Sequence, residues 1–241
     1  SDFTNIKRNG KIAMKLQDGD DLVGVMPCNE TDDVLLATRD GKAIRFGVDA
    51  VRVFRGRDST GVRGIRLLGN DHVVSMSVIN DDADQFILSV TENGYGKRTP
   101  VGDYRRSGRG GQGVANIETS QRNGKVMASF AVVDDDQLML VTNLGQVIRI
   151  RVHGGEGDSI RVASRKTQGV RLFDVADDEN EKVVSAGLVR ETYDDDEETR
   201  TGGVSSNRAG DAQVKMAPDT VSEDAKIETP GKTDPEEDAP A

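Results

Sequence analysis

A short apolar run that ends in Thr-x-x-Gly occurs three times in this chain, and a segment carrying basic residues follows each copy. The three turns are Thr38–Gly41, Thr91–Gly94 and Thr142–Gly145, and their glycines lie 53 and 51 residues apart. A fixed period near fifty residues is typical of arrays of small β units such as propeller blades. The repeat therefore predicts an array fold.

A second recurring element alternates with the first, and an apolar strand follows each of its copies after a polar turn. Its alternation of apolar and polar residues is the period of a half-buried strand. Each unit thus supplies about four strands, and no amphipathic helix is evident in residues 1–190. We predict an all-β chain, a β-pinwheel or propeller-like array of three complete blades and the end of another. The copies of this element are Gly10–Leu16, Gly61–Leu67, Gly113–Ile117 and Gly169–Phe173.

The formal net charge of −10 over 241 residues is unevenly distributed. Residues 191–241 hold 15 acidic and 5 basic side chains, whereas residues 1–190 hold 27 of each sign. The acidic segment is too polar to bury a core, so we predict blades over 1–190 and a disordered acidic tail over 191–241. Such a tail is expected to compete with a polyanion for basic side chains.

Neither a disulfide framework nor a membrane anchor is expected from this sequence. Cys28 is the only cysteine, and every apolar run is no longer than a strand. A reducing cytoplasm, without membrane association, fits this composition.

Positive charge is concentrated in one part of each repeat. The windows 42–66, 97–109 and 149–171 carry 18 basic against 5 acidic residues, while the rest of 1–190 carries 9 against 22. Because the same segment recurs in each unit, its cations are expected along one edge of the array, which is the pattern of a polyanion-binding surface. The alternative is a solvated face whose arginines pair with acidic turns of neighbouring units.

Four stretches of the repeat resemble the C-terminal domain of the bacterial DNA gyrase A protein, and the resemblance runs from about Phe3 to Val189. It implies a six-bladed β-pinwheel whose neighbouring blades exchange a strand, with this chain holding the end of the third blade and the fourth to sixth. The stretches are Gly41–Phe46, Thr60–Leu67, Asn93–Thr99 and Thr167–Val170.

The resemblance also implies a function, which is to wrap duplex DNA around basic side chains during ATP-dependent negative supercoiling. The implied partners are the rest of the gyrase A protein and the gyrase B protein, in a nucleoid-associated complex. ATP and Mg²⁺ would be used elsewhere in the enzyme, so no cofactor, metal or catalytic residue is expected here. The implied DNA contacts are Lys42, Arg45, Arg52, Arg55, Arg57, Arg63, Lys97, Arg98, Arg105, Arg106, Arg109, Arg149, Arg151, Arg161, Arg165 and Lys166.

The chain departs from the family pattern at one place. The signature heptad Gln-Arg-Arg-Gly-Gly-Lys-Gly is absent, and Arg109–Gly113 resembles a degenerate copy of it with Gln112 in place of the lysine. Two other functions stay open: a propeller scaffold for an acidic protein, and the related domain of topoisomerase IV. A dinucleotide site at Gly108–Gly113 is disfavoured because a strand-like segment follows it.

Overall fold

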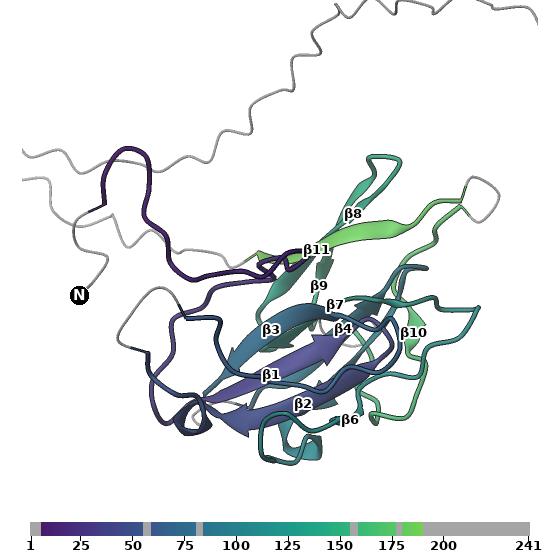
Figure 1. Cartoon of the computed structure of the whole chain (residues 1–241). Coiled ribbons are helices and arrows are strands. Elements are labelled where there is room, and N and C mark those ends of the chain that lie inside the picture. Colours follow the sequence, from purple (N-terminus) through teal and green to yellow (C-terminus); the bar gives the residue numbers. More distant parts are fainter. Residues whose placement is uncertain (1–5, 55–58, 81–83, 155–158, 177–179, 190–241) are drawn as a thin grey trace, which may run out of the picture. The chain divides into compact units, whose positions relative to one another are not determined.

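The computed structural model describes residues 6–54, 59–80, 84–154, 159–176 and 180–189 (Figure 1). These residues belong to one compact unit, Ser1–Tyr193. The acidic tail predicted for 191–241 lies outside the described residues. The described part consists of β-strands and two short 3-10 turns, which confirms the all-β class. None of its helices is long and apolar enough to cross a membrane.

Three sheets are built, each around one Thr-x-x-Gly hairpin (Figure 1). The 3-10 turns η1 (Val48–Ala50) and η2 (Val101–Asp103) follow the first two hairpins. The first sheet has the order β3 (Val73–Ile79), β1 (Asp33–Thr38), β2 (Lys42–Gly47), β6 (Val114–Ala115). The second has the order β10 (Val170–Arg171), β5 (Tyr95–Pro100), β4 (Phe86–Thr91), β7 (Val126–Val132), and the third β11 (Val183–Val189), β8 (Gln137–Thr142), β9 (Val147–Arg151).

The repeated threonine and glycine close each hairpin. Gly41, Gly94 and Gly145 have φ angles of 84°, 76° and 85°, a left-handed conformation that glycine adopts at little cost. The hydroxyl of Thr38 accepts a hydrogen bond from the Lys42 amide at 3.2 Å, and Thr142 does the same for Gln146. The Thr-x-x-Gly pattern therefore marks a hairpin turn, which the threonine hydroxyl and the glycine conformation stabilise locally.

The first two sheets are each completed by a strand from the following unit. β6 comes after β5 in sequence yet pairs with β2, with Val114 opposite Ala43. β10 comes after β9 yet pairs with β5. Just upstream of these strands, Arg106 forms a parallel bridge with Arg45, and Val162 forms one with Arg98. The strand exchange implied by the resemblance is present in both sheets.

The sheets pack together along β3, β7 and β11. The Ser129 amide donates to Ser75 Oγ at 3.0 Å, which ties the first sheet to the second. Two apolar clusters fill the spaces between sheets, one that includes Leu35 and Ile87 and one that includes Leu88 and Leu140. The edges that carry β6 and β10 lie at the other end of each sheet order. In the first two sheets, the exchanged strand and the strand that packs against the next sheet therefore lie at opposite edges.

A buried polar network fixes the first exchange. Asn116 directly follows β6 and is fully buried. Its Oδ1 accepts from the Tyr104 hydroxyl at 2.5 Å and from Ser89 Oγ at 3.1 Å, while its Nδ2 donates to Ser129 Oγ at 3.1 Å. Buried polar groups need such partners, so this network favours one position of the exchanged segment.

Candidate nucleic-acid interface

The predicted cations fall into groups that differ in exposure. Arg45 and Arg165 are partly buried, Lys97 and Arg98 are buried, and Arg55 and Arg57 lie outside the described residues. The exposed candidates are Lys42, Arg52, Arg63, Arg105, Arg106, Arg109, Arg149, Arg151, Arg161 and Lys166.

Lys97 and Arg98 hold an exchanged segment in place. Lys97 is fully buried on β5, and its ammonium donates to the Ser164 carbonyl. Arg98 donates from Nε to the Ile160 carbonyl at 2.8 Å and pairs with Asp134. Neither side chain can reach a phosphate while residues 160–164 cover β5. Their burial favours a structural role over the DNA contact that the resemblance implied.

The buried position of Lys97 lowers its pKa. Burial, together with the nearby positive charge of Arg165, lowers the pKa of Lys97 to about 8. Desolvation disfavours an ammonium ion, which explains the direction.

Arg45 and Arg165 fasten the other side of the exchange. Arg45 Nε lies 2.6 Å from Asp33 Oδ2, and its Nη1 donates to the Val101 carbonyl at 3.2 Å. Arg165 donates to the Ala115 carbonyl at 3.0 Å and lies 6.0 Å from the ring centre of Tyr104. Both cations are thus partly buried and form hydrogen bonds with backbone carbonyls of the neighbouring unit.

Exposed cations of two successive windows meet at the connection that follows η2. Arg109 donates from Nε to the Ala50 carbonyl at 3.0 Å and from Nη1 to the Arg63 carbonyl at 3.2 Å. The Arg66 amide donates to the Gly111 carbonyl, so the two connections run beside each other. Arg105 lines the small pocket at this connection. This connection therefore places cations from residues 42–66 next to cations from residues 97–109.

Arg106 is an exposed cation that pairs with two carboxylates. Its Nε lies 3.0 Å from Asp33 Oδ1, and its Nη2 lies 2.9 Å from Asp49 Oδ1. The acidic-turn pairing considered from the sequence thus occurs here, while more than half of the Arg106 side chain stays exposed.

The same arrangement recurs one unit later. The Glu118 amide donates to the Thr167 carbonyl at 3.0 Å, which lays the second connection beside the first exchanged segment. Arg161 and Lys166 are exposed on this connection. In the third sheet, Arg149 and Arg151 occupy alternate exposed positions of β9. Exposed basic side chains therefore occur on both inter-unit connections and on β9.

Two further arginines surround Tyr95 and were not among the predicted contacts. Arg171 Nη2 lies 3.1 Å and Arg122 Nε 3.4 Å from the Tyr95 hydroxyl, and both hydrogen bonds lower the pKa of Tyr95. Arg171 belongs to a basic window, which is a signal that sequence reasoning could have used. Arg122 lies outside every window and reaches Tyr95 only through the fold.

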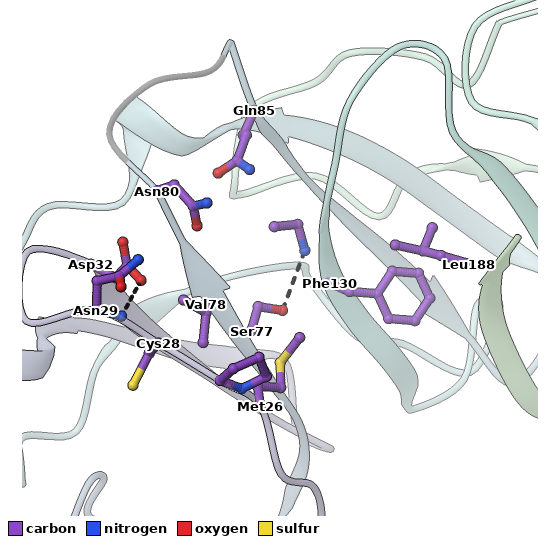
Figure 2. Close-up of a pocket in the computed structure, with 12 residues that line it drawn as sticks. Met26, Cys28, Asn29, Asp32, Ser77, Val78, Asn80, Gln85, Phe130 and Leu188 are labelled. Carbon is purple, nitrogen blue, oxygen red and sulfur yellow. Dashed lines mark hydrogen bonds between the residues drawn. The ribbon is translucent and has the colours of Figure 1, made fainter. Parts of the chain in front are cut away.

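The pocket in Figure 2 has a different chemistry from these connections. It lies among β3, β7, β11 and the segment before β1, and it is lined by apolar, amide and carboxyl groups without a cation, including Met26, Asn29, Asp32, Phe130 and Leu188. The Ala131 amide donates to Ser77 Oγ within it. Among the described residues, no group of three His, Cys, Asp or Glu side chains could hold a metal ion. The residues that line the pocket thus offer no positive charge to a phosphate.

Comparison with known proteins decides the family. Residues 1–29, 32–80, 85–132 and 136–190 match the family model described as DNA gyrase C-terminal domain, beta-propeller. This chain belongs to the DNA gyrase C-terminal domain family. The DNA gyrase A protein of Rickettsia bellii is 37% identical over 82% of this chain and 26% of its own length. That of Salmonella typhimurium is 44% identical over 82% of this chain and 21% of its own length. The chain thus spans about a quarter of the length of these relatives.

Solved structures agree with the gyrase assignment. A structure of a DNA gyrase A C-terminal domain superposes with a TM-score of 0.66 at 25% identity, over 78% of this chain and 59% of that one. The C-terminal domain of a DNA topoisomerase IV superposes with a TM-score of 0.69 at 24% identity, over 78% and 56%, and shows the shared fold alone. The sequence relatives therefore favour gyrase over topoisomerase IV.

Proposed function

We propose that this gyrase A C-terminal domain binds duplex DNA without sequence preference and bends it, in support of negative supercoiling by the gyrase holoenzyme. The observation that carries the proposal is the repetition of exposed cations on successive inter-unit connections. We call six of them the connection cations: Arg63, Arg105, Arg106, Arg109, Arg161 and Lys166.

The chemistry of this surface suits phosphate contacts better than base contacts. The connection cations stand on irregular segments, and no α-helix among the described residues could enter a major groove. Aromatic residues make up 4% of the chain and tryptophan is absent, which disfavours stacking on single strands. Affinity from phosphate neutralisation does not depend on sequence, and a bent duplex brings more phosphates into contact.

The proposal also covers the partners. The chain would act beside the rest of the gyrase A protein and the gyrase B protein, in the cytoplasm with the nucleoid. On this proposal, ATP and Mg²⁺ would be used by those other parts of the holoenzyme.

Salt dependence tests the proposal. If all six connection cations contact phosphate, the logarithm of the binding constant should fall by roughly five for each tenfold rise in salt. Titration of a random-sequence duplex from low to physiological salt, followed by fluorescence anisotropy, measures this slope. A nearly flat dependence, or no binding to random duplex, would contradict DNA binding and favour the protein-scaffold function.

A matched pair of lysine variants tests the location. Lys166→Gln should weaken binding to every duplex and lower the slope by about 0.9. Lys125→Gln is the control, because Lys125 is also exposed but lies outside the basic windows and pairs with Asp40 at 2.7 Å. Equal losses in both variants would show that total charge matters and the connections do not.

A further inference from the structure

Tyr95 brings together two arginines from different parts of the chain. Tyr95 begins β5, Arg122 lies on the turn that precedes β7, and Arg171 ends β10. Arg171 Nη2 donates to the Tyr95 hydroxyl at 3.1 Å, and Arg122 Nε donates to the same oxygen at 3.4 Å. Two cations therefore share one hydroxyl group.

The fold holds both arginines against the tyrosine. Arg171 lies opposite Tyr95 in the pairing of β10 with β5. The side chain of Asn93 donates to the carbonyls of Gln121 at 3.2 Å and Arg122 at 3.1 Å, which fixes the turn. The guanidinium carbons of Arg122 and Arg171 lie 4.9 and 5.5 Å from the centre of the Tyr95 ring, whose π electrons attract cations. Tyr95 itself is 5% exposed, so the group is built on a buried side chain.

The hydroxyl of Tyr95 has a proton left to donate. It accepts a hydrogen bond from each arginine, and a guanidinium group, which has donors only, cannot accept one in return. Among the residues that the structure describes, none accepts this proton. The hydroxyl therefore offers one hydrogen bond to an acceptor that the described residues do not supply.

The two arginines also keep donors free. Arg171 pairs with Asp174 through Nη1, and its Nε has no partner among the described residues. Arg122 forms no ion pair within the described part of the chain, and its two terminal nitrogens make no hydrogen bond there. Both side chains are exposed. The group thus carries two positive charges against the single carboxylate of Asp174.

An oxyanion suits this arrangement. Like charges held close together repel, and a bound anion offsets the repulsion. Guanidinium groups match the oxygens of phosphate and carboxylate with paired N–H donors. The oxygens of a phosphate group point in several directions, so one can accept from the Tyr95 hydroxyl while others accept from Arg122 and Arg171. The two coplanar oxygens of a carboxylate serve three separate donors less well.

We propose that Tyr95, Arg122 and Arg171 form a binding site for a phosphate group. None of the three belongs to the connection cations, and Arg122 lies outside every basic window. The phosphate can belong to a duplex backbone or to a small phosphate compound. The backbone source rests on the proposed function, whereas the second source does not.

The position of the site suits the backbone source. Ser120 Oγ donates to Gln168 Oε1 at 3.3 Å, and Asn123 Nδ2 donates to the Gln168 carbonyl at 3.1 Å. The turn that carries Arg122 therefore lies beside the connection that carries Lys166. A duplex bound at Lys166 can extend its contacts to this site.

The ionisation of Tyr95 reports whether phosphate occupies the site. The hydrogen bonds from Arg171 and Arg122 lower the pKa of Tyr95. A bound phosphate offsets those positive charges and accepts the phenol proton, so inorganic phosphate should raise this pKa in a saturable way. Absorbance titration of the full chain measures the pKa, and Tyr95→Phe identifies the transition by its loss. Sodium chloride at the same ionic strength is the control for screening and should shift the pKa far less.

Calorimetric titration with inorganic phosphate measures the affinity of each variant. Arg122→Gln and Arg171→Gln should each weaken binding by about tenfold or more, because each removes charge-assisted hydrogen bonds. Tyr95→Phe keeps the ring and should weaken binding several-fold. Lys125→Gln is the matched control and should bind phosphate like the original chain, since Lys125 lies on the same turn but pairs with Asp40. Circular dichroism of all four variants reports their folding.

Duplex binding separates the two sources of phosphate. If the site holds a backbone phosphate, Arg122→Gln should lower the salt-dependence slope of random-duplex binding by about 0.9. Unchanged duplex binding together with a lost affinity for inorganic phosphate would assign the site to small phosphate compounds. A chain that binds inorganic phosphate here but binds no duplex would contradict the proposed function and support the phosphate site.

Three results would overturn the phosphate site. One is a Tyr95 pKa that phosphate moves no further than chloride does. Another is unchanged affinity for phosphate in folded Arg122→Gln, which would mean that this arginine only holds the turn against β5. The third is an equal loss of affinity in Lys125→Gln, which would show a diffuse effect of charge.

Discussion

Cations of the basic windows have two different roles in this chain. Lys97 and Arg98 are buried under residues 160–164 and bind carbonyl groups there, whereas Arg161 and Lys166 on that same connection are exposed. A buried ammonium is costly unless its hydrogen-bonding capacity is used, and one carbonyl bond from Lys97 offsets part of that cost. The titration of Lys97 therefore reports whether the exchanged segment that contains Ser164 covers β5.

The pH dependence of stability should show the burial of Lys97. Its folded pKa of about 8 lies below the ordinary value of 10.5, so the unfolded chain binds more protons between those values. Stability should therefore rise with pH over this window, by about 1 to 3 kcal/mol from this group. Lys97→Met should remove that rise. Urea midpoints of both proteins at several pH values from 7.5 to 10.5 measure it, and parallel curves would contradict it.

Charge placement could be predicted from sequence, but burial could not. The three basic windows follow from the periodic turn alone, and many of their arginines are exposed as expected. Lys97 is buried because its ammonium meets Ser164, which lies 67 residues later. Arg122 likewise reaches Tyr95 across the fold. Neither contact can be recognised from the residues next to it in the sequence.

At the scale of the element, the Thr-x-x-Gly hairpin is the best predicted part of the molecule. Its threonine hydroxyl, its glycine and the flanking alternation all act within a few residues, so the sequence contains the cause of the structure. The strand that pairs with the second strand of each hairpin could not be predicted locally, because β6 and β10 come from the next unit. Only the resemblance to a known family predicted that exchange.

The strand exchange makes Gly41 less tolerant of a side chain than Gly145, although both have a positive φ. Gly41→Ala and Gly145→Ala carry the same cost of a positive φ, about 1 kcal/mol or somewhat more. Gly41→Ala should lose several kcal/mol beyond that, since its Cβ would overlap the Ile117 carbonyl, whereas Gly145 has open space. Thermal unfolding at low protein concentration compares the two variants. Equal losses would mean that the exchanged strand moves aside without cost.

At the scale of the whole molecule, the net charge of the chain lies in its C-terminal segment. Residues 191–241 contribute a net charge of −10, and the rest of the chain is neutral in sum. The connection cations therefore act in the presence of tethered carboxylates. Tethering raises the local concentration of carboxylate near the cations that DNA would use.

Deletion of residues 191–241 should tighten binding to a random duplex several-fold at low salt and less at high salt, because salt screens the competition. Anisotropy titrations of the full and shortened chains measure the change. A replacement of the same length made of Gly and Ser separates charge from chain length, and it should bind like the shortened chain. Unchanged affinity at low salt would rule out competition by the acidic segment.

The exchanged strands also set the order in which a new chain can fold. The first hairpin, β1 and β2, leaves the ribosome before the segment that completes its sheet, because Lys42 pairs with Ala115. The second hairpin waits in the same way until Val170 pairs with Gly96. Domains fold as their residues emerge, so each unit here stays one strand short until most of the next has been made. The growing chain therefore always ends in an unfinished sheet, and a pause in synthesis exposes one open strand edge to other molecules.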